Sequence, residues 1–339
     1  MTHDVTGIIQ RRQEVLVESL KDCSPVMLFE KIFDDNVMSL IVENSMKYAG
    51  QHNRHSFETD KPELRTFLAI LCFTGYHELP SERAYWSLNE DLSVPLIANC
   101  TSRNRFSDIK RNLNFVDNSL AEGSNDKMFK MRPLCDLIQK NSCQWGVFHE
   151  NLSIDESMIK YFGRHPAKQY IMGKAVRFGY RSWAATSSDG YCYTFDIYCG
   201  KSTEVSIDPL GSRVVKSLLA KMPIVPKEHV VYFDNFFTNY QLLHDLRLLG
   251  YRATGTIREN RTKICPVTDV KTMRKKPRVD YDYRFDTKNE IIIVRWKDKN
   301  VVTMGSNFDA VKGGVVYKNK KWMYIYQDCL SIITEAWVE

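Results

Sequence analysis

The sequence predicts an α/β protein, with an all-α part followed by a part built on a β-sheet. Two observations point to this class. Between residues 24 and 138, apolar residues recur at spacings of three and four, as on the buried face of a helix. From residue 151 onward, short runs of β-branched and aromatic residues alternate with turn signals, which is typical of strands. The two patterns meet near residue 150.

The helical part contains recognisable helix starts. Residues 1–24 are polar and mixed, so we expect a flexible, ill-packed arm there. Pro62 lies near the first turn of one helix, and Thr101 or Ser102 is a suitable N-cap for another. The expected buried stripes are Leu64, Phe67, Leu68, Leu71 and Cys72 in the first helix, and Phe106, Ile109 and Leu113 in the second.

The sheet part is expected to begin with a meander of strands. Asp189-Gly190 lies between two strand-like runs, residues 178–183 and 191–198, and is a strong hairpin signal. The pattern then predicts helix, strand, helix and strand at residues 214–222, 230–233, 236–249 and 251–256. This order of elements is that of a ribonuclease-H-like α/β core.

The domain boundaries follow from these patterns. Residues 258–299 are rich in charges and turn signals until a strand-like sequence pattern begins again at residue 290. We therefore expect them to be an insertion or a long exposed segment. The predicted organisation is an arm at 1–24, a helical domain at 25–150, a ribonuclease-H-like core at 151–257, the insertion at 258–299, the end of the core at 300–316, and a closing helix at 317–339 that returns to the helical domain.

Composition excludes several classes of protein. The formal net charge of +6 on 339 residues is too small to identify a nucleic-acid binder by itself. No apolar run is long enough to span a membrane, and the polar first residues do not resemble a signal peptide. The nine cysteines are scattered, lie mostly among apolar neighbours and include no Cys-x-x-Cys, so we expect reduced core thiols in an intracellular protein and no zinc site. The usual phosphate-loop and dinucleotide motifs are missing from the sequence, and no small-molecule cofactor is expected.

Two acidic residues follow short apolar strands. Asp155 comes after residues 151–154, and Asp234 comes after residues 230–233. A carboxylate beside buried apolar residues is costly unless a cation neutralises it, so strand ends that converge on a metal ion are one interpretation. The alternative is that both acids are structural strand-end or N-cap groups.

Basic residues gather in two dense groups. The first group lies on the expected outer face of the helix that follows Ser102, and consists of Arg103, Arg105, Lys110 and Arg111. The second is a run of Lys271, Arg274, Lys275, Lys276 and Arg278. Such groups are most often solvated surfaces, and otherwise they contact phosphates or form a nuclear import signal.

The order of several short segments resembles the piggyBac transposase family and the domesticated proteins derived from it. The segments that match best are residues 152–159 with Gly163-Arg164, residues 233–238, and residues 255–258. In the helical part, residues 102–106 and 130–134 also fit. The resemblance implies a ribonuclease-H-like core with three catalytic aspartates, beside a helical domain that dimerises and binds DNA. The family prefers TTAA target sites.

The resemblance assigns Asp155 and Asp234 to the first two catalytic positions, where they would hold Mg²⁺. The third position follows a Gly-Gly-Val signature, and here it is occupied by Val316. A stretch of the family pattern after this position is also missing, so any Mg²⁺ is expected to be weakly held. Asp309, Asp328 and Glu335 are the acids that could substitute for the lost ligand. DNA contacts are expected from the first basic group and from Arg164, Lys168, Lys174 and Arg177, since affinity for a duplex comes mainly from cations.

Three functions remain open from the sequence. The leading one is a nuclear, transposase-derived protein that binds double-stranded DNA, forms a homodimer and lacks catalytic activity. The second is an active Mg²⁺-dependent transposase or nuclease with a substitute third carboxylate. The third is a degenerate, poorly folded fragment of a transposase. The missing third aspartate favours the first over the second.

Overall fold

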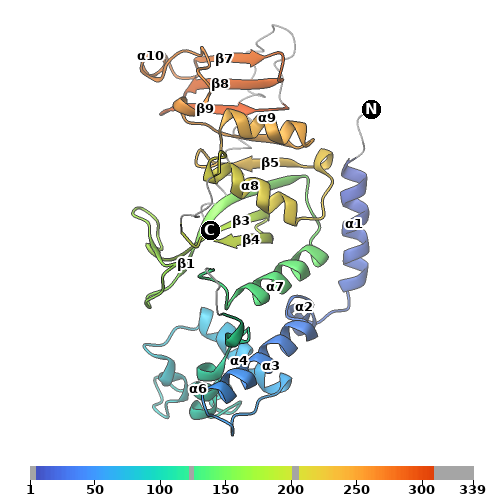
Figure 1. The fold of residues 1–339 in the computed structure, drawn as a ribbon, viewed down its shortest axis with the longest axis vertical. Helices are drawn as coiled ribbons and strands as arrows, with labels where there is room; N and C mark the ends of the chain where they lie inside the picture. Colours follow the sequence, from blue (N-terminus) through green and yellow to red (C-terminus); the bar gives the residue numbers. More distant parts are fainter. Residues whose placement is uncertain (1–4, 122–125, 201–205, 309–339) are drawn as a thin grey trace. The chain divides into compact units, whose positions relative to one another are not determined.

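The computed structural model describes residues 5–121, 126–200 and 206–308, and its ribbon is shown in Figure 1. The chain divides into two compact units. One consists of residues 23–141, and the other combines residues 1–22 with residues 142–339. The predicted all-α domain was given the bounds 25–150, so the compact helical unit ends earlier than expected. The closing helix predicted at 317–339, and residues 309–316 of the segment 300–316, lie outside the described residues.

In the described part of residues 23–141, all the regular secondary structure is helical. The helices are α2 (Pro25–Ile32), α3 (Asp35–Gln51), α4 (Lys61–Tyr76), η1 (Glu82–Trp86), α5 (Pro95–Ala98), α6 (Arg103–Asn112), η2 (Asn118–Ala121) and the first ten residues of α7 (Arg132–Trp145). The side chain of Ser102 caps α6 by accepting a hydrogen bond from the amide of Arg105, as the sequence predicted. Asp60 caps α4 in the same way through the amide of Glu63.

The core of the helical unit differs from the predicted stripe at two positions. Leu64, Phe67 and Phe106 are almost fully buried, as expected. Leu71 is 38% exposed, however, and Cys72 is also exposed, so the stripe of α4 is narrower than predicted. Ile70 takes their place in the core.

The segment expected to be a flexible arm forms a helix instead, α1 (Val5–Leu20). Arg12 binds this helix to the rest of its unit. The guanidinium donates hydrogen bonds to the carbonyl oxygens of Gly146 at 2.7 Å and Cys143 at 3.2 Å, and it lies 4.8 Å from the centre of the Phe148 ring. These carbonyls belong to the end of α7, where free acceptors attract a cation. A long-range contact of this kind gives no local sequence signal.

The described part of residues 142–308 is built on a nine-stranded mixed sheet, which confirms the predicted α/β class. The strands are β1 (Asn151–Lys160), β2 (Gln169–Tyr170), β3 (Phe178–Ser187), β4 (Cys192–Ile197), β5 (Val230–Phe233), β6 (Arg252–Thr256), β7 (Tyr281–Asp286), β8 (Ile291–Lys297) and β9 (Val301–Ser306). Their order is β2-β3-β1-β5-β6-β9-β8-β7, with β4 paired to β3. The pairs β1–β5 and β5–β6 are parallel, and the other pairs are antiparallel.

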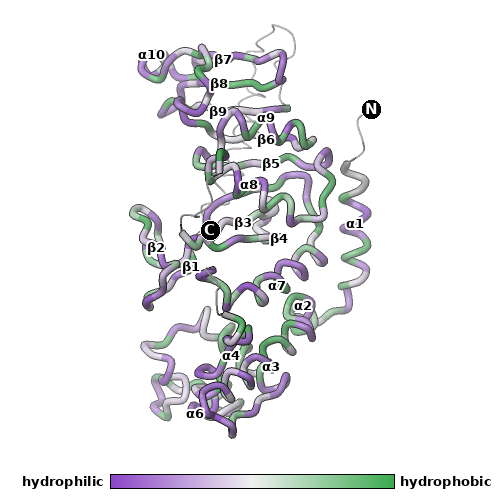
Figure 2. The backbone as a smooth tube through the Cα atoms, viewed as in Figure 1, coloured by the Kyte–Doolittle hydropathy of each residue, from purple (hydrophilic) through white to green (hydrophobic). Residues whose placement is uncertain are grey.

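Two helices cover the middle of the sheet, α8 (Leu210–Lys221) and α9 (Tyr240–Leu248). Polar and apolar residues alternate along α8 in Figure 2, as expected of a helix with one buried face. The apolar residues Leu218 and Leu243 pack with Leu152, Ile154 and other strand residues in the main core of this unit. This packing holds β1 and β5 side by side.

Residues 258–299, expected to be an insertion or an exposed segment, contain two strands that join the sheet. β8 pairs with β9 and carries β7 on its other edge. Short helices η4 (Glu259–Arg261) and α10 (Val270–Arg274) precede them. Arg295 on β8 is almost completely buried and donates hydrogen bonds to Thr303 and Glu259. The segment therefore forms one edge of the sheet.

Candidate functional site

Asp155 and Asp234 lie beside each other on neighbouring parallel strands. β1 and β5 pair with Ile154 opposite Phe233, and the two aspartates are the next residues along each strand. The sequence predicted that both acids end a strand. This is correct for Asp234 but wrong for Asp155, because β1 continues to Lys160 through its antiparallel pairing with β3. The predicted convergence of the two carboxylates is nevertheless observed.

The carboxyl group of Asp155 is held in an environment that disfavours its charge. Burial raises its pKa to about 6, although the amide of Glu156 donates a hydrogen bond to it at 2.6 Å. The negative charge of Asp234 raises the pKa further. Burial beside a second carboxylate is the setting in which a bound cation would be most stabilising.

Asp234 sits in a tight turn after β5. Burial raises its pKa, while a 2.8 Å hydrogen bond from the amide of Phe236 and the charge of Arg258 lower it. The backbone carbonyl of Asp234 accepts a 2.7 Å hydrogen bond from the hydroxyl of Thr238. Gly255 on β6 leaves room for this turn, since a Cβ there would collide with the carbonyl oxygen of Phe233 and the Thr238 hydroxyl.

Cations lie near the aspartate pair, and two of them, Arg181 and Arg261, were not among the residues predicted from the sequence. Glu156 forms ion pairs with Arg181 on β3 and, at 3.5 Å, with Lys174. Arg261 donates hydrogen bonds to the carbonyls of Asn235 and Phe236, beside Asp234. Arg181 and Arg261 were absent from the predicted site because each reaches it from a distant strand or turn. In the sequence, the only indication of these charged surroundings was that Glu156 and Arg258 lie in segments that match the family.

The described residues do not assemble a third acidic or histidine ligand with this pair, since they contain no group of three such side chains able to hold a metal ion. Glu156 follows Asp155 directly, and side chains alternate between the faces of a strand, so Glu156 points to the opposite face. Two carboxylates alone do not fit a two-ion site, which needs ligands on both ions. Val316 and the candidate substitutes Asp309, Asp328 and Glu335 lie outside the described residues.

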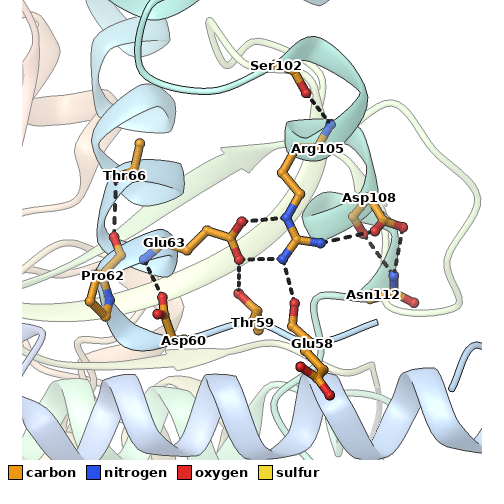
Figure 3. Close-up of polar contacts among 10 residues, drawn as sticks. All are labelled: Glu58, Thr59, Asp60, Pro62, Glu63, Thr66, Ser102, Arg105, Asp108 and Asn112. Atoms are coloured by element: carbon orange, nitrogen blue, oxygen red, sulfur yellow. Dashed lines mark hydrogen bonds and ion pairs between the residues drawn. The ribbon is translucent and has the colours of Figure 1, made fainter. Parts of the chain in front are cut away.

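The first predicted DNA-contact group divides into two kinds of residue. Arg103 and Arg111 are exposed on α6, and Lys110 pairs with Glu82. Arg105 is different, because its guanidinium binds both carboxylate oxygens of Glu63, the carboxylate of Asp108 and the carbonyl of Glu58 (Figure 3). The hydrogen bond to Glu63 raises the pKa of Arg105 and lowers that of Glu63. Arg105 therefore ties α6 to α4.

The other predicted DNA contacts, Arg164, Lys168, Lys174 and Arg177, also divide into exposed and structural residues. Arg164 and Arg177 are exposed. Lys168 donates hydrogen bonds to the carbonyls of Phe162 at 3.1 Å and Gly163 at 3.0 Å, so it stabilises the loop between β1 and β2. Lys174 forms an ion pair with Glu156, the residue after Asp155. The positive charge of Lys174 lowers the pKa of Asp155.

The basic run predicted as a nuclear signal lies on and after α10. Met273 is the buried residue of this short helix, while Lys271, Arg274 and Lys275 are exposed. Lys276 is half-buried, and Arg278 pairs with Asp298 at 2.6 Å. Most of the run is therefore accessible on the surface.

Two further findings concern composition. Among the described cysteines, which are all free of disulfides, Cys143 is the buried one, whereas several others are exposed, so the prediction of mainly core thiols is wrong. Within the described ranges, no helix combines the length and the apolar character that a membrane crossing requires.

Comparison with known proteins places the site in context. A family model described as Transposase IS4 matches residues 24–334. The PiggyBac transposable element-derived protein 2 of Homo sapiens is 38% identical over 296 residues, covering 86% of this chain and 50% of that protein. The PiggyBac transposable element-derived protein 3 of Homo sapiens is 34% identical over 287 residues, covering 84% of this chain and 48% of that protein. The chain thus spans about half the length of these curated relatives.

A solved structure shares the fold. It is the cryo-EM structure of a piggyBac transposase synaptic complex with hairpin DNA, which superimposes with a TM-score of 0.76 at 25% sequence identity. The match covers 92% of this chain and 67% of the other. The mixed α/β fold with its large sheet is therefore similar to that of a piggyBac transposase.

Proposed function

Because this chain belongs to the piggyBac transposase family, we propose that it is a nuclear, transposase-derived protein that binds double-stranded DNA and lacks DNA-cleavage activity. The proposal is supported most by one observation. β1 carries Asp155 beside Asp234 and leads into a segment with the exposed cations Arg164 and Arg177, so the carboxylate pair adjoins a surface whose charge attracts DNA phosphates.

A ribonuclease-H-like core is the fold we propose for residues 151–257 with the end of the sheet. The central parallel strands β1, β5 and β6, with β3 antiparallel beside β1, support it. In such a core, acidic side chains of neighbouring strands gather at one edge. Asp155 and Asp234 occupy that arrangement here.

Catalytic inactivity is proposed from the third family position, Val316. A valine supplies neither charge nor oxygen, and Mg²⁺ prefers six oxygen ligands in near-octahedral geometry. Asp155 and Asp234 would hold a single Mg²⁺ weakly, with water or DNA phosphate oxygens as the remaining ligands. Such an ion would neutralise the two carboxylates and attract a phosphate.

DNA binding is proposed for two surfaces of exposed cations. Arg103 and Arg111 form the first, with Lys110 beside them. Arg164 and Arg177 form the second, where Lys168 and Lys174 hold the local structure. Phosphate contacts of this kind give affinity without sequence information, so the DNA sequence bound is set elsewhere. A homodimer and nuclear import through residues 271–278 complete the proposal.

The test measures cleavage and binding together. A labelled duplex containing TTAA is incubated with the full chain and Mg²⁺ or Mn²⁺, and wild type is compared with Asp155→Ala. We expect binding by both proteins and no nick that depends on Asp155. Failure to bind the duplex would overturn the proposed function.

The second candidate is an active Mg²⁺-dependent nuclease or transposase with a substitute carboxylate. The observation that favours it is that Asp155 and Asp234 follow paired residues of neighbouring strands, where a cation would stabilise the two buried carboxylates. Nicking by wild type that disappears in Asp155→Ala would establish this candidate. Variants Asp309→Ala, Asp328→Ala and Glu335→Ala would then identify the substitute.

A further inference from the structure

A β-ribbon that extends beyond the carboxylate pair carries a second kind of surface. We call residues 157–181 the ribbon; they include the end of β1, all of β2 and the start of β3. In Figure 1 the strands β1 and β3 run outward at this end of the sheet, and Figure 2 shows that the ribbon mixes polar and apolar residues. The predicted role of this segment was phosphate contact by its cations alone.

Large apolar side chains of the ribbon are exposed to solvent. Phe162 is 73% exposed and Tyr170 is 55% exposed. Ile159, Met172 and Phe178 are also among the exposed large hydrophobic residues. A cluster of exposed aromatic residues is costly in water, and it usually marks a surface that binds something.

Four rings of the ribbon form two pairs, of which Tyr170 and Phe178 are exposed and Tyr161 and Tyr180 are half-buried. The ring centres of Tyr170 and Phe178 lie 4.8 Å apart, and those of Tyr161 and Tyr180 lie 5.0 Å apart. Backbone pairing of Tyr170 with Phe178 fixes the first pair. At Gly179, a Cβ would collide with the carbonyl oxygen of Ile159, so the strands approach closely behind the rings. The rings thus form a preformed platform.

The platform lies on the same face of the sheet as Asp155. The β1–β3 register is continuous from Leu152 opposite Ser187 to Lys160 opposite Gly179. Since side chains alternate along a strand, Ile159 shares a face with Asp155, and its partner Tyr180 shares that face too. Four residues of strand separate Ile159 from Asp155 by about 13 Å, roughly the length of two nucleotides of extended strand.

Cations accompany the rings. The ammonium of Lys160 lies 5.4 Å from the centre of the Phe162 ring, and that of Lys168 lies 5.4 Å from the centre of the Phe178 ring. Arg164 and Arg177 are exposed in the same ribbon. Stacking rings interleaved with cations are the combination that binds unpaired nucleotides, because every base has a π-face and every nucleotide has a phosphate.

We propose that the ribbon binds the unpaired nucleotides of a DNA strand end. Bases stack on Tyr170 and Phe162, phosphates meet Arg164 and Arg177, and the strand leads along β1 toward Asp155. This inference rests on the proposed function, since it assumes that the chain binds DNA. A membrane or a protein partner would also cover apolar residues, but the cations interleaved with the rings favour a nucleic-acid strand.

The test compares two labelled duplexes of the same sequence, one blunt and one with a short thymidine overhang. We expect the full chain to bind the overhang duplex about tenfold more tightly, which corresponds to stacking of about one base. Tyr170→Leu should abolish this preference, whereas Tyr170→Phe should retain it, because both variants keep apolar bulk and only phenylalanine keeps a ring. Leu88→Ala is the matched control, since Leu88 is a 97% exposed apolar residue of the helical unit.

The outcomes separate the two proposals. If neither duplex binds, the proposed function itself fails. If both duplexes bind equally and Tyr170→Leu changes nothing, DNA binding stands and the inference about the ribbon is wrong. An equal loss with Tyr170→Leu and Tyr170→Phe, or a loss with Leu88→Ala, would also contradict stacking on the ribbon.

Discussion

The guanidinium of Arg181 forms an ion pair with Glu156, the residue directly after Asp155. The same guanidinium lies 4.5 Å from the centre of the Phe236 ring, in the turn that begins at Asp234. The Glu156 side chain is only 14% exposed and the Arg181 side chain only 17%. One cation therefore links β1, β3 and the turn after β5 through residues that follow the two aspartates in sequence.

Replacing Arg181 by methionine is expected to destabilise the sheet unit. Arg181→Met keeps an apolar chain over Phe236 but leaves the carboxylate of Glu156 buried with only the more distant Lys174. Removing one partner of a buried ion pair costs about 3 kcal/mol. Urea denaturation followed by circular dichroism measures the loss. The control is Arg177→Met, at an exposed position directly before β3, which should change the free energy of unfolding by less than about 0.5 kcal/mol. An equal effect of the two variants would rule out a stabilising role of the buried ion pair.

The raised pKa of Asp155 predicts a pH-dependent stability. The folded value is about 6 and the ordinary value is 3.8, so between these pH values the folded state binds more protons than the unfolded state. Stability from this group is present below pH 4 and is lost as the pH rises through 6. Asp155→Asn should therefore stabilise the protein at pH 7.5 by about 3 kcal/mol at most and have little effect at pH 4. Denaturation curves at both pH values test this, and a loss of stability at pH 7.5 would contradict it.

Added Mg²⁺ should partly relieve the repulsion between the two carboxylates. If the dissociation constant of the ion is in the millimolar range, 10 mM Mg²⁺ is expected to stabilise the folded state by about 1 kcal/mol. A thermal-shift measurement at pH 7.5 should detect this in wild type and not in Asp155→Asn. The same stabilisation in the variant would show that the ion binds elsewhere.

Arg105 and Arg103 are expected to behave in opposite ways. Arg105→Ala removes the ion pair with Glu63 and the hydrogen bond to the Glu58 carbonyl, and should destabilise the helical unit by about 2 kcal/mol. Arg103→Ala, two residues away on the exposed face of α6, should leave stability unchanged. Thermal denaturation of the two variants makes the comparison, and similar melting curves would count against the structural role of Arg105.

Salt dependence tests the DNA-contact role of α6. If Arg103 and Arg111 each contact a phosphate, the double variant Arg103→Ala/Arg111→Ala should lower the slope of log affinity against log salt by about two. Fluorescence anisotropy with a blunt duplex over a range of salt concentrations gives the slope. An unchanged slope would mean that the exposed face of α6 does not meet the DNA.

The sequence could predict the carboxylate pair because parallel strands bring their carboxyl ends to one edge of a sheet. Apolar runs before Asp155 and Asp234 were enough to place both acids together. The end of β1 was mispredicted, because its last five residues are held by pairing with β3 rather than by apolar burial. Helix starts were equally accessible, since capping depends on residues three apart, as at Ser102.

The electrostatic partners could not be predicted in this way. Arg105 meets Glu63 across 42 residues of chain, and Arg181 meets Glu156 through a strand register that no local pattern specifies. The sequence pattern predicts a solvent-exposed side chain for a basic residue on an outer helix face, whether or not a distant acidic residue binds it. The division of the predicted DNA contacts into exposed and structural cations therefore required the structure.

The attachment of α1 has a consequence for how this chain is made. Arg12 is bound to the carbonyl of Gly146, 134 residues later, and the whole helical unit lies between them. During synthesis the helical unit emerges complete while α1 still has no binding site, since the end of α7 is translated only afterwards. Closing a loop of this length is entropically costly. If the residues between Arg12 and Gly146 are already folded, less flexible chain remains to be ordered when the loop closes. We expect that folding of residues 23–141 before this contact forms replaces most of the long flexible loop by a compact unit and lowers the entropic cost of joining α1 to the end of α7.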